Sequence, residues 1–396
     1  MQDEQTRGAT AAIPAEQPFL NTVRWLAAAL VGFSHIWLMV INPDLARGGV
    51  AGLLTVVAQA RIGFVVVFFV LSGYLVGGGV LERAAGLDVR RYATDRFSRI
   101  YVALIPAILL TLALDGTAFL LDRHNPVYDA AWPTWVLGGE GPFAHYRPLY
   151  IAATLVSLES IWQPPFGSNG ALWSLGFEWF FYFLLPALVV PLARLRHAVW
   201  AQGTAALAVA ALFLALGKSE WATYWAIWCA GAFVRLGKER VRLPMMLVPV
   251  LAAVGVAAFF WCGSNIEWQR RLAHLTLGGA LALILSQPRV LEASFNRTCD
   301  HALASFSYSF YIVHLPVMTF SALLAWMAGW LPVGGRGVDI AALALVAALF
   351  ATSTAVAFGF GHLFEARTGD VRRWLNGLGQ PTRAQKKADD LPAAGS

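Results

Sequence analysis

Charged residues and cysteines are scarce in this sequence. Asp, Glu, Lys and Arg make up 13% of its 396 residues, whereas hydrophobic residues make up 58%. A soluble globular domain carries about 25% charged residues, and a soluble all-α protein of the present composition would have to bury nearly every helix on all sides. The shortage of charge therefore excludes an ordinary soluble domain and favours a chain that lies mostly within a membrane.

The three cysteines, Cys229, Cys262 and Cys299, form no CxxC pair and have no metal-ligand spacing. The sequence therefore predicts no metal site and no permanently bound cofactor. The first 18 residues are polar and lack the apolar core of a cleavable signal peptide. We expect the first apolar segment to direct the chain to the membrane.

Long apolar runs, in contrast, are abundant. Runs of about 20 residues, each enough to cross a ~30 Å hydrocarbon layer, recur at 19–41, 62–81, 100–121, 171–192, 198–216, 219–236, 243–262, 271–287, 305–330 and 339–363. The stretch 149–162 is shorter and carries Glu159, which suits an interfacial or re-entrant segment better than a crossing. The sequence thus predicts an all-α polytopic membrane protein of about ten transmembrane helices.

The basic residues predict how the chain is oriented. If residue 1 lies in the cytoplasm and 149–162 does not cross, the cytoplasmic segments hold 20 of the 29 Lys and Arg residues. Membrane proteins keep an excess of Lys and Arg on the cytoplasmic side, whereas a crossing at 149–162 would largely remove this bias. We therefore expect a multi-pass protein of the cell membrane with both termini in the cytoplasm.

Three regions are predicted along the chain. Residues 1–18 form a polar cytoplasmic segment, 19–363 the transmembrane domain and 364–396 a basic cytoplasmic tail. The transmembrane domain contains a long outer loop, 122–170, which is either part of a binding surface or an ordered cap over the helices. No internal repeat of fixed period is visible, so a transporter built from two halves finds no support.

Ionisable side chains inside apolar segments mark candidate functional residues, because each costs at least ~2.5–3.5 kcal/mol to insert. Arg24 and His35 are 11 residues apart in the first segment, so they face one side of a helix about 16 Å apart along its axis. The arginine suits an anionic group, and the imidazole suits proton transfer. The alternatives are snorkelling of Arg24 to the headgroups and an ordinary hydrogen bond of His35.

Two further segments carry charge. Arg96 and Arg99 lie one turn apart at the cytoplasmic end of the third segment, where they suit either phosphate binding or anchoring at the membrane surface. Glu178 is surrounded by aromatic and aliphatic residues in the fourth segment. It must pair with a cation, be protonated or line a wet cavity, and a structural ion pair is the main alternative to a functional role.

The ninth segment carries hydroxyl groups and an imidazole. Ser307, Tyr311 and His314 fall on one helical face, and Pro316 frees a backbone carbonyl that polar side chains can satisfy. Hydrogen bonding between helices is the alternative interpretation of this face.

Taken in order, these segments resemble the membrane acyltransferase 3 family, whose members O-acylate sugars of surface polysaccharides and related glycans. The matching motifs run from residue 24 to residue 316. They are R-x10-H (Arg24, His35), FFVLSG (68–73), RxxR (Arg96, Arg99), WSLxxE (Trp173 to Glu178) and SYSxYxxHxP (Ser307 to Pro316).

The resemblance implies transfer of an acyl group from acyl-CoA, expected to be acetyl-CoA, to a hydroxyl of a glycan or glycolipid. The expected site residues are catalytic His35, Arg24 and Glu178, donor-binding Arg96, Arg99, Ser72 and Gly73, and acceptor-binding Trp173, Ser174, Tyr311 and His314. His35 suits a general base because the unperturbed pKa of histidine is about 6.5. The expected partners are acyl-CoA, the acceptor and the bilayer, with no nucleic acid.

Two other functions stay open at this point. A transporter or flippase would use the same buried charges to line a translocation path. An acyltransferase for a lipid or a small metabolite would share the donor site and differ only in its acceptor. The oligomeric state is also left open.

Overall fold

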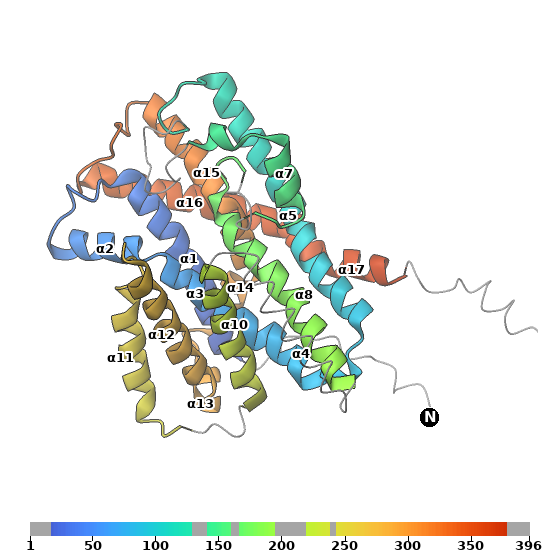
Figure 1. Cartoon of the computed structure of the whole chain (residues 1–396). Helices are drawn as coiled ribbons and strands as arrows, with labels where there is room; N and C mark the ends of the chain where they lie inside the picture. The colour runs from blue at the N-terminus through green and yellow to red at the C-terminus, as the bar shows by residue number, and fades with distance from the viewer. Residues whose placement is uncertain (1–16, 129–140, 160–165, 195–218, 238–242, 378–396) are drawn as a thin grey trace, which may run out of the picture.

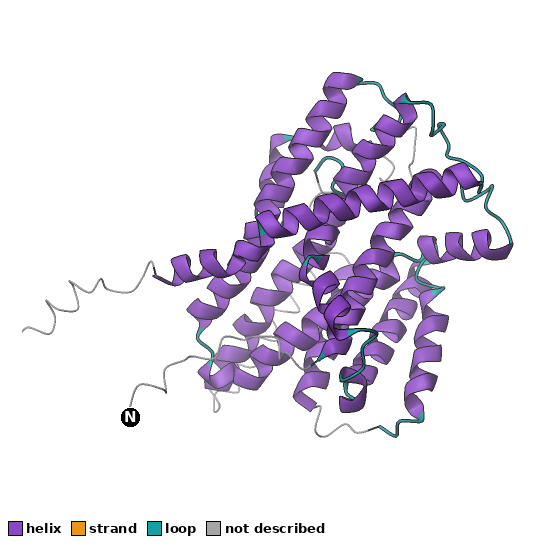
Figure 2. Ribbon diagram, turned by 180° about the vertical axis from the view of Figure 1, so that it is seen from behind, coloured by secondary structure: helices purple, strands orange, loops and turns teal. Residues whose placement is uncertain are grey.

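The computed structural model describes residues 17–128, 141–159, 166–194, 219–237 and 243–377, which form helices and no strand (Figure 1 and, from behind, Figure 2). The helices of more than six residues are α1 (Pro18–Val40), α2 (Gly49–Gln59), α3 (Ile62–Ser72), α5 (Val89–Leu121), α7 (Pro148–Leu155), α8 (Trp173–Arg194), α10 (Ser219–Gly237), α11 (Leu247–Phe259), α12 (Glu267–Leu285), α14 (Arg297–Ser305), α15 (Ser307–Met327), α16 (Ile340–Leu363) and α17 (Thr368–Gly377).

Six helical stretches in these ranges are long and apolar enough to cross a membrane: Pro18–Val40, Ile62–Gly86, Val89–Leu121, Gly170–Arg194, Ser307–Met327 and Ile340–Gly377. The predicted all-α class and the multi-pass membrane character are thereby confirmed. α10 and α12 have 19 residues each and α11 has 13, and none of the three belongs to this set. The predicted crossing at 198–216 lies outside the described residues, so the count of about ten stays a prediction.

The crossing helices define two faces of the bundle, which we name by α1. The basic face is the one at which α1 begins, and the opposite face is the one at which it ends at Val40. α14 lies at the basic face, because its Asp300 accepts hydrogen bonds from Thr22 (2.6 Å) and Trp25 (2.8 Å) of α1. At the opposite face the backbone of Arg336 pairs with that of Ile41.

Glycines allow α3 and α10 to pack with their backbones in contact. A Cβ atom at Gly73 would lie 1.8 Å from the carbonyl oxygen of Trp228, and one at Gly231 would lie 2.2 Å from that of Val70. Small residues permit such close approach in membrane proteins. The α3 stretch continues past this contact through a single π-helical turn, Gly73–Gly77, into α4 (Gly78–Arg83).

α8 begins inside the bundle rather than at its surface. α7 has only eight residues, too few to cross a bilayer. The chain just before α8 is held by two buried side chains of α5. The Ser168 backbone and hydroxyl donate to Asp115 of α5 (2.8 and 2.6 Å), and the Asn169 amide donates to Thr111 of α5 (3.1 Å). The chain that leads into α8 is therefore buried within the bundle.

Candidate active site

Two histidines from different helices meet inside the bundle. His35 Nδ1 of α1 lies 3.1 Å from His314 Nε2 of α15, and the two rings are stacked with their centroids 5.2 Å apart. His314 has no exposed surface, whereas His35 retains part of its surface. The structure thus joins two predicted residues that the sequence placed 279 positions apart.

The surroundings of His314 determine which ring nitrogens carry protons. Its Nδ1 lies 2.8 Å from the carbonyl oxygen of Tyr311 and 3.1 Å from that of Phe310. Carbonyl oxygens only accept, so His314 Nδ1 must carry a hydrogen, and in the neutral ring Nε2 is then an acceptor. His35 Nδ1 therefore donates to it, which leaves the lone pair of a neutral His35 on Nε2.

Pro316 has the effect predicted for it, with an unexpected partner. Proline lacks the N–H that would bond to the carbonyl four residues earlier, here the carbonyl of Ile312. The Asn169 amide donates to that carbonyl at 2.9 Å. Because Asn169 lies four residues before Trp173, the proline in α15 positions the start of α8.

Of the predicted acceptor-binding residues, Ser174 and Tyr311 lie next to the histidine pair. The hydroxyl groups of Ser174 and Tyr311 are 2.6 Å apart, and the Tyr311 ring lies 6.0 Å from the His314 ring. Trp173 faces the other way, toward Tyr224 of α10, with ring centroids 5.7 Å apart. Ser307, which the sequence placed on the same face as Tyr311, instead donates to the carbonyl of Ala304.

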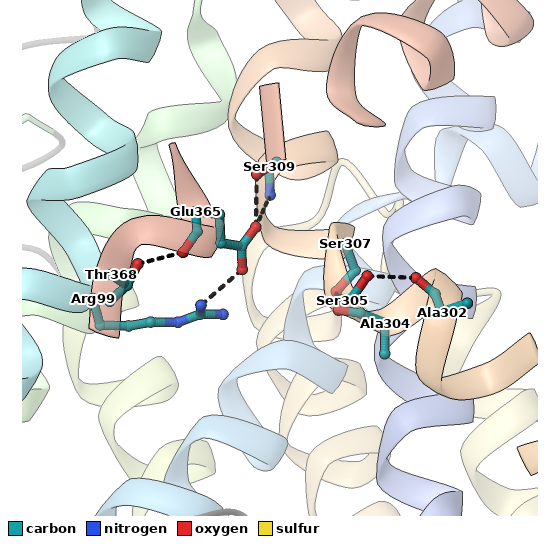
Figure 3. Close-up of polar contacts among 8 residues, drawn as sticks. All are labelled: Arg99, Ala302, Ala304, Ser305, Ser307, Ser309, Glu365 and Thr368. Carbon is teal, nitrogen blue, oxygen red and sulfur yellow. Dashed lines mark hydrogen bonds and ion pairs between the residues drawn. The ribbon is translucent and has the colours of Figure 1, made fainter. Parts of the chain in front are cut away.

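Arg99, the second arginine of the RxxR motif, is held by a buried carboxylate. Arg99 Nη1 donates to Glu365 Oε1 at 2.7 Å, and Glu365 Oε2 accepts from the backbone and hydroxyl of Ser309 at 3.2 and 2.6 Å (Figure 3). The Arg99 guanidinium also lies 5.1 Å from the centre of the Tyr308 ring. A carboxylate bonded to three donors is a rigid anchor, so Glu365 fixes the direction of Arg99.

Arg96 and Arg24 complete the basic part of the site. The Arg96 guanidinium lies over the rings of Tyr92 (5.9 Å) and Tyr182 (5.8 Å), and its buried Nε has no hydrogen-bond partner in the described part of the chain. Arg24 interacts electrostatically with Arg99 and with both Glu365 and Glu178. Three guanidinium groups and two carboxyl groups thus form one cluster, in which basic side chains outnumber acidic ones and favour an anionic ligand.

Glu178 lies with the arginines and not with the histidines. Its carboxylate faces Ser72 and Tyr182 and interacts electrostatically with Arg99 and Arg96. The Ser72 hydroxyl donates to Tyr182 (3.2 Å). The structure therefore brings Ser72 to the edge of the arginine cluster.

Gly73 is separated from this cluster. It is buried against the backbone of Trp228 of α10, so it contributes close helix packing and has no free surface toward the arginines.

Comparison with known proteins identifies the family. A family model described as an acyltransferase domain matches residues 17–362, most of the chain and all of the motif residues above. The chain belongs to the acyltransferase 3 family. No curated protein and no solved structure gives a match. The protein is therefore a membrane acyltransferase.

In this acyltransferase, sequence reasoning missed Glu365. Glu365 falls in the predicted tail and three residues beyond the matched domain, yet only 8% of its surface is exposed. The one signal in the sequence was that Glu365 follows directly after the last apolar run. A single carboxylate in that position, however, is typical of a solvated tail. Asn169 was missed as well, because the sequence does not reveal that residues 166–172 enter the bundle.

Glu159 is a second buried carboxylate of the acyltransferase. It has no exposed surface, and neither carboxylate oxygen has a hydrogen-bond partner among the described residues. It packs against α8, where a Cβ atom at Gly176 would lie 2.8 Å from the Glu159 carbonyl oxygen. Burial raises the pKa of Glu159 to about 8, so this side chain is neutral at neutral pH.

This raised pKa predicts a specific loss of stability in alkali. A carboxyl with a pKa higher in the folded than in the unfolded state stabilises the fold fully below the unfolded value, about 4.3. That contribution is lost as the pH rises toward about 8. We expect Glu159→Gln, which cannot ionise, to leave the melting temperature unchanged at pH near 4 and to raise it by several degrees at pH near 8.

Differential scanning calorimetry of the purified protein in lipid nanodiscs measures this effect. The matched control is Glu292→Gln, because Glu292 is exposed. If wild type and Glu159→Gln lose stability in parallel as the pH rises, Glu159 is already ionised in the folded protein.

Proposed function

We propose that this protein is an O-acyltransferase that moves an acyl group, expected to be acetyl, from acyl-CoA to a hydroxyl of a glycan or glycolipid. The observation that carries the proposal is the His35–His314 pair, which leaves an unprotonated Nε2 on a partly accessible His35. Arg24, the member of the arginine cluster on the same helix, lies about 16 Å from His35 along the axis of α1, toward the end where a CoA ester would enter.

The arginine cluster suits the donor. CoA carries phosphate groups, and guanidinium groups bind phosphate with paired, charge-assisted hydrogen bonds. Arg96 presents a buried Nε that no described residue satisfies, and Glu365 holds Arg99 in a fixed direction. With the basic face in the cytoplasm, as the excess of Lys and Arg indicates, the phosphates stay at that face while the thioester arm extends toward the histidines.

The histidine pair suits the chemistry of transfer. His35 Nε2 accepts the proton of the acceptor hydroxyl as its oxygen attacks the thioester carbonyl. The C–S bond then breaks, the ester forms, and the proton passes to the departing CoA sulfur. His314 keeps the His35 ring in the required tautomer, as the third member of a nucleophile–base–orienter arrangement does. Ser174 and Tyr311 lie beside the pair, where they can hydrogen-bond the acceptor.

Radiolabelled acetyl-CoA tests the proposal in membranes that contain the protein. We expect label in the glycan or glycolipid fraction with wild type and background label with His35→Ala. A flippase would produce no covalent label, and an acyltransferase for other acceptors would label the simple-lipid or small-molecule fraction. Full labelling of glycan by the His35→Ala variant would remove His35 from the mechanism.

A further inference from the structure

A polar cavity opens near the opposite face of the bundle, away from the arginine cluster. It has a volume of about 390 Å³, and its walls include Arg61, Glu220, Asn265, Arg270, Trp173 and Tyr224. Arg61 directly precedes α3, and Glu220 and Arg270 lie in the first turns of α10 and α12. α10 reaches the basic face only at its other end, where Arg235 pairs with Glu82. We call this space the α3–α12 cavity.

The α3–α12 cavity carries a positive charge. Two guanidinium groups and one carboxylate line it, which gives a net charge of +1. Arg270 lies 3.5 Å from Glu220 and donates to the carbonyl oxygen of Ser264 at 3.2 Å. These two contacts fix the Arg270 guanidinium at the wall, with Arg61 as the second cation of the same space.

Aromatic rings form part of the cavity wall. Trp173 and Tyr224 lie with their ring centroids 5.7 Å apart, inclined at 49°, and Trp173 is only partly buried. Rings of this kind offer an apolar face beside polar groups, which suits the C–H face of a sugar ring. Asn265 and Arg270 would then meet its hydroxyl and anionic substituents.

The cavity adjoins the histidine pair. Trp173 lines the cavity, and its neighbour Ser174 contacts Tyr311, which lies beside His314. Arg61 is also close enough to interact electrostatically with His35. The cavity therefore reaches the turn of α8 that carries Ser174, whose hydroxyl meets Tyr311 beside the histidine pair.

We propose that the α3–α12 cavity binds the acceptor as a sugar that carries an anionic group, either a carboxylate or a phosphate. The proposal rests on the proposed function only in naming the occupant as the acceptor. An anion beside the acylated hydroxyl forms charge-assisted hydrogen bonds to these guanidinium groups, whereas a neutral sugar forms only the weaker neutral ones. Glu220 weakens the attraction between Arg270 and the anionic group, because it pairs with Arg270 itself.

Calorimetric titration of the full-length protein in nanodiscs tests the proposal with four probes: digalacturonate, its neutral dimethyl ester, glucose phosphate and glucose. We expect at least one anionic probe to bind at least about tenfold more tightly than its neutral partner. Preference for digalacturonate alone assigns a carboxylate, and preference for glucose phosphate alone assigns a phosphate. Equal binding, or no binding, of all four probes overturns the proposal.

Three variants locate the binding. Arg61→Gln is expected to abolish the preference for the anionic probe, and Glu220→Gln is expected to increase affinity severalfold because it releases Arg270. A gain cannot arise from misfolding. Arg47→Gln is the matched control, because Arg47 lies at the same face with 78% of its side chain exposed. Unchanged affinity in both the Arg61 and Glu220 variants contradicts the proposal.

The same preparations separate this proposal from the proposed function. Binding of acetyl-CoA to the basic face should be equal in wild type, Arg61→Gln and Glu220→Gln. Anion-selective sugar binding without any acyl transfer would uphold the cavity and reject the transferase reaction. Acyl transfer that proceeds equally well with neutral and anionic acceptors would uphold the transferase reaction and reject an anion-selective acceptor cavity.

Discussion

Replacing His35 by alanine is expected to lower the rate of acyl transfer by about 10³-fold, the typical contribution of a general base. The loss should appear in kcat, because His35 lies about 16 Å from the donor phosphate site along α1. Initial rates with purified protein in nanodiscs measure it, with acetyl-CoA binding as the check on folding. A variant that keeps kcat within a few-fold of wild type would show that another group accepts the proton.

The partner histidine provides a sharper form of this prediction. His314→Gln retains an amide oxygen that can accept from His35 Nδ1, whereas His314→Leu does not. We expect the leucine variant to lose at least about tenfold more kcat than the glutamine variant. If both variants lose the same activity, His314 acts through packing alone and does not set the tautomer of His35.

Replacing Arg99 by alanine is expected to raise the KM for acetyl-CoA by roughly 10- to 100-fold, the value of one hydrogen bond between charged groups. Arg96→Ala should act in the same direction, since both side chains point into one cluster. Arg99→Lys should recover only part of the loss, because an ammonium group cannot bond Glu365 and a phosphate with the fixed geometry of a guanidinium.

The matched control for these arginines is Arg90→Ala. Arg90 lies near the start of the same helix, is exposed, and keeps the basic face otherwise intact. Steady-state kinetics at varied acetyl-CoA and saturating acceptor give KM and kcat separately. An unchanged KM in Arg96→Ala and Arg99→Ala, or an equal rise in Arg90→Ala, would place the donor elsewhere.

Much of the helical architecture was predictable, because an apolar run long enough to cross the membrane almost always forms a transmembrane helix. The runs at 305–330 and 339–363 correspond to α15 (Ser307–Met327) and α16 (Ile340–Leu363). The start of α5 was predicted too late, at residue 100. The helix begins at Val89, where Asp88 accepts a hydrogen bond from the Arg91 backbone. A side-chain cap of this kind extends a helix through a charged segment that hydrophobicity alone does not mark.

The chemistry of the site was easier to predict than its geometry. The cost of burying charge pointed to Arg24, His35 and Glu178 one at a time. Which of them meet is decided by how helices pack, and a single sequence does not contain that information. His314 pairs with His35 because α1 lies against α15, and Glu365 is buried only because Arg99 and Ser309 surround it.

The measurement that tests the account most directly repeats the labelling reaction in sealed proteoliposomes with the protein in one orientation. Membrane-impermeant acetyl-CoA is supplied on one side, and the glycan acceptor on the other. We predict transfer only when acetyl-CoA faces the basic side of the bundle and the acceptor faces the opposite side. Equal transfer with the two substrates exchanged, or with both confined to one side, would contradict a donor site and an acceptor cavity joined through the histidine pair.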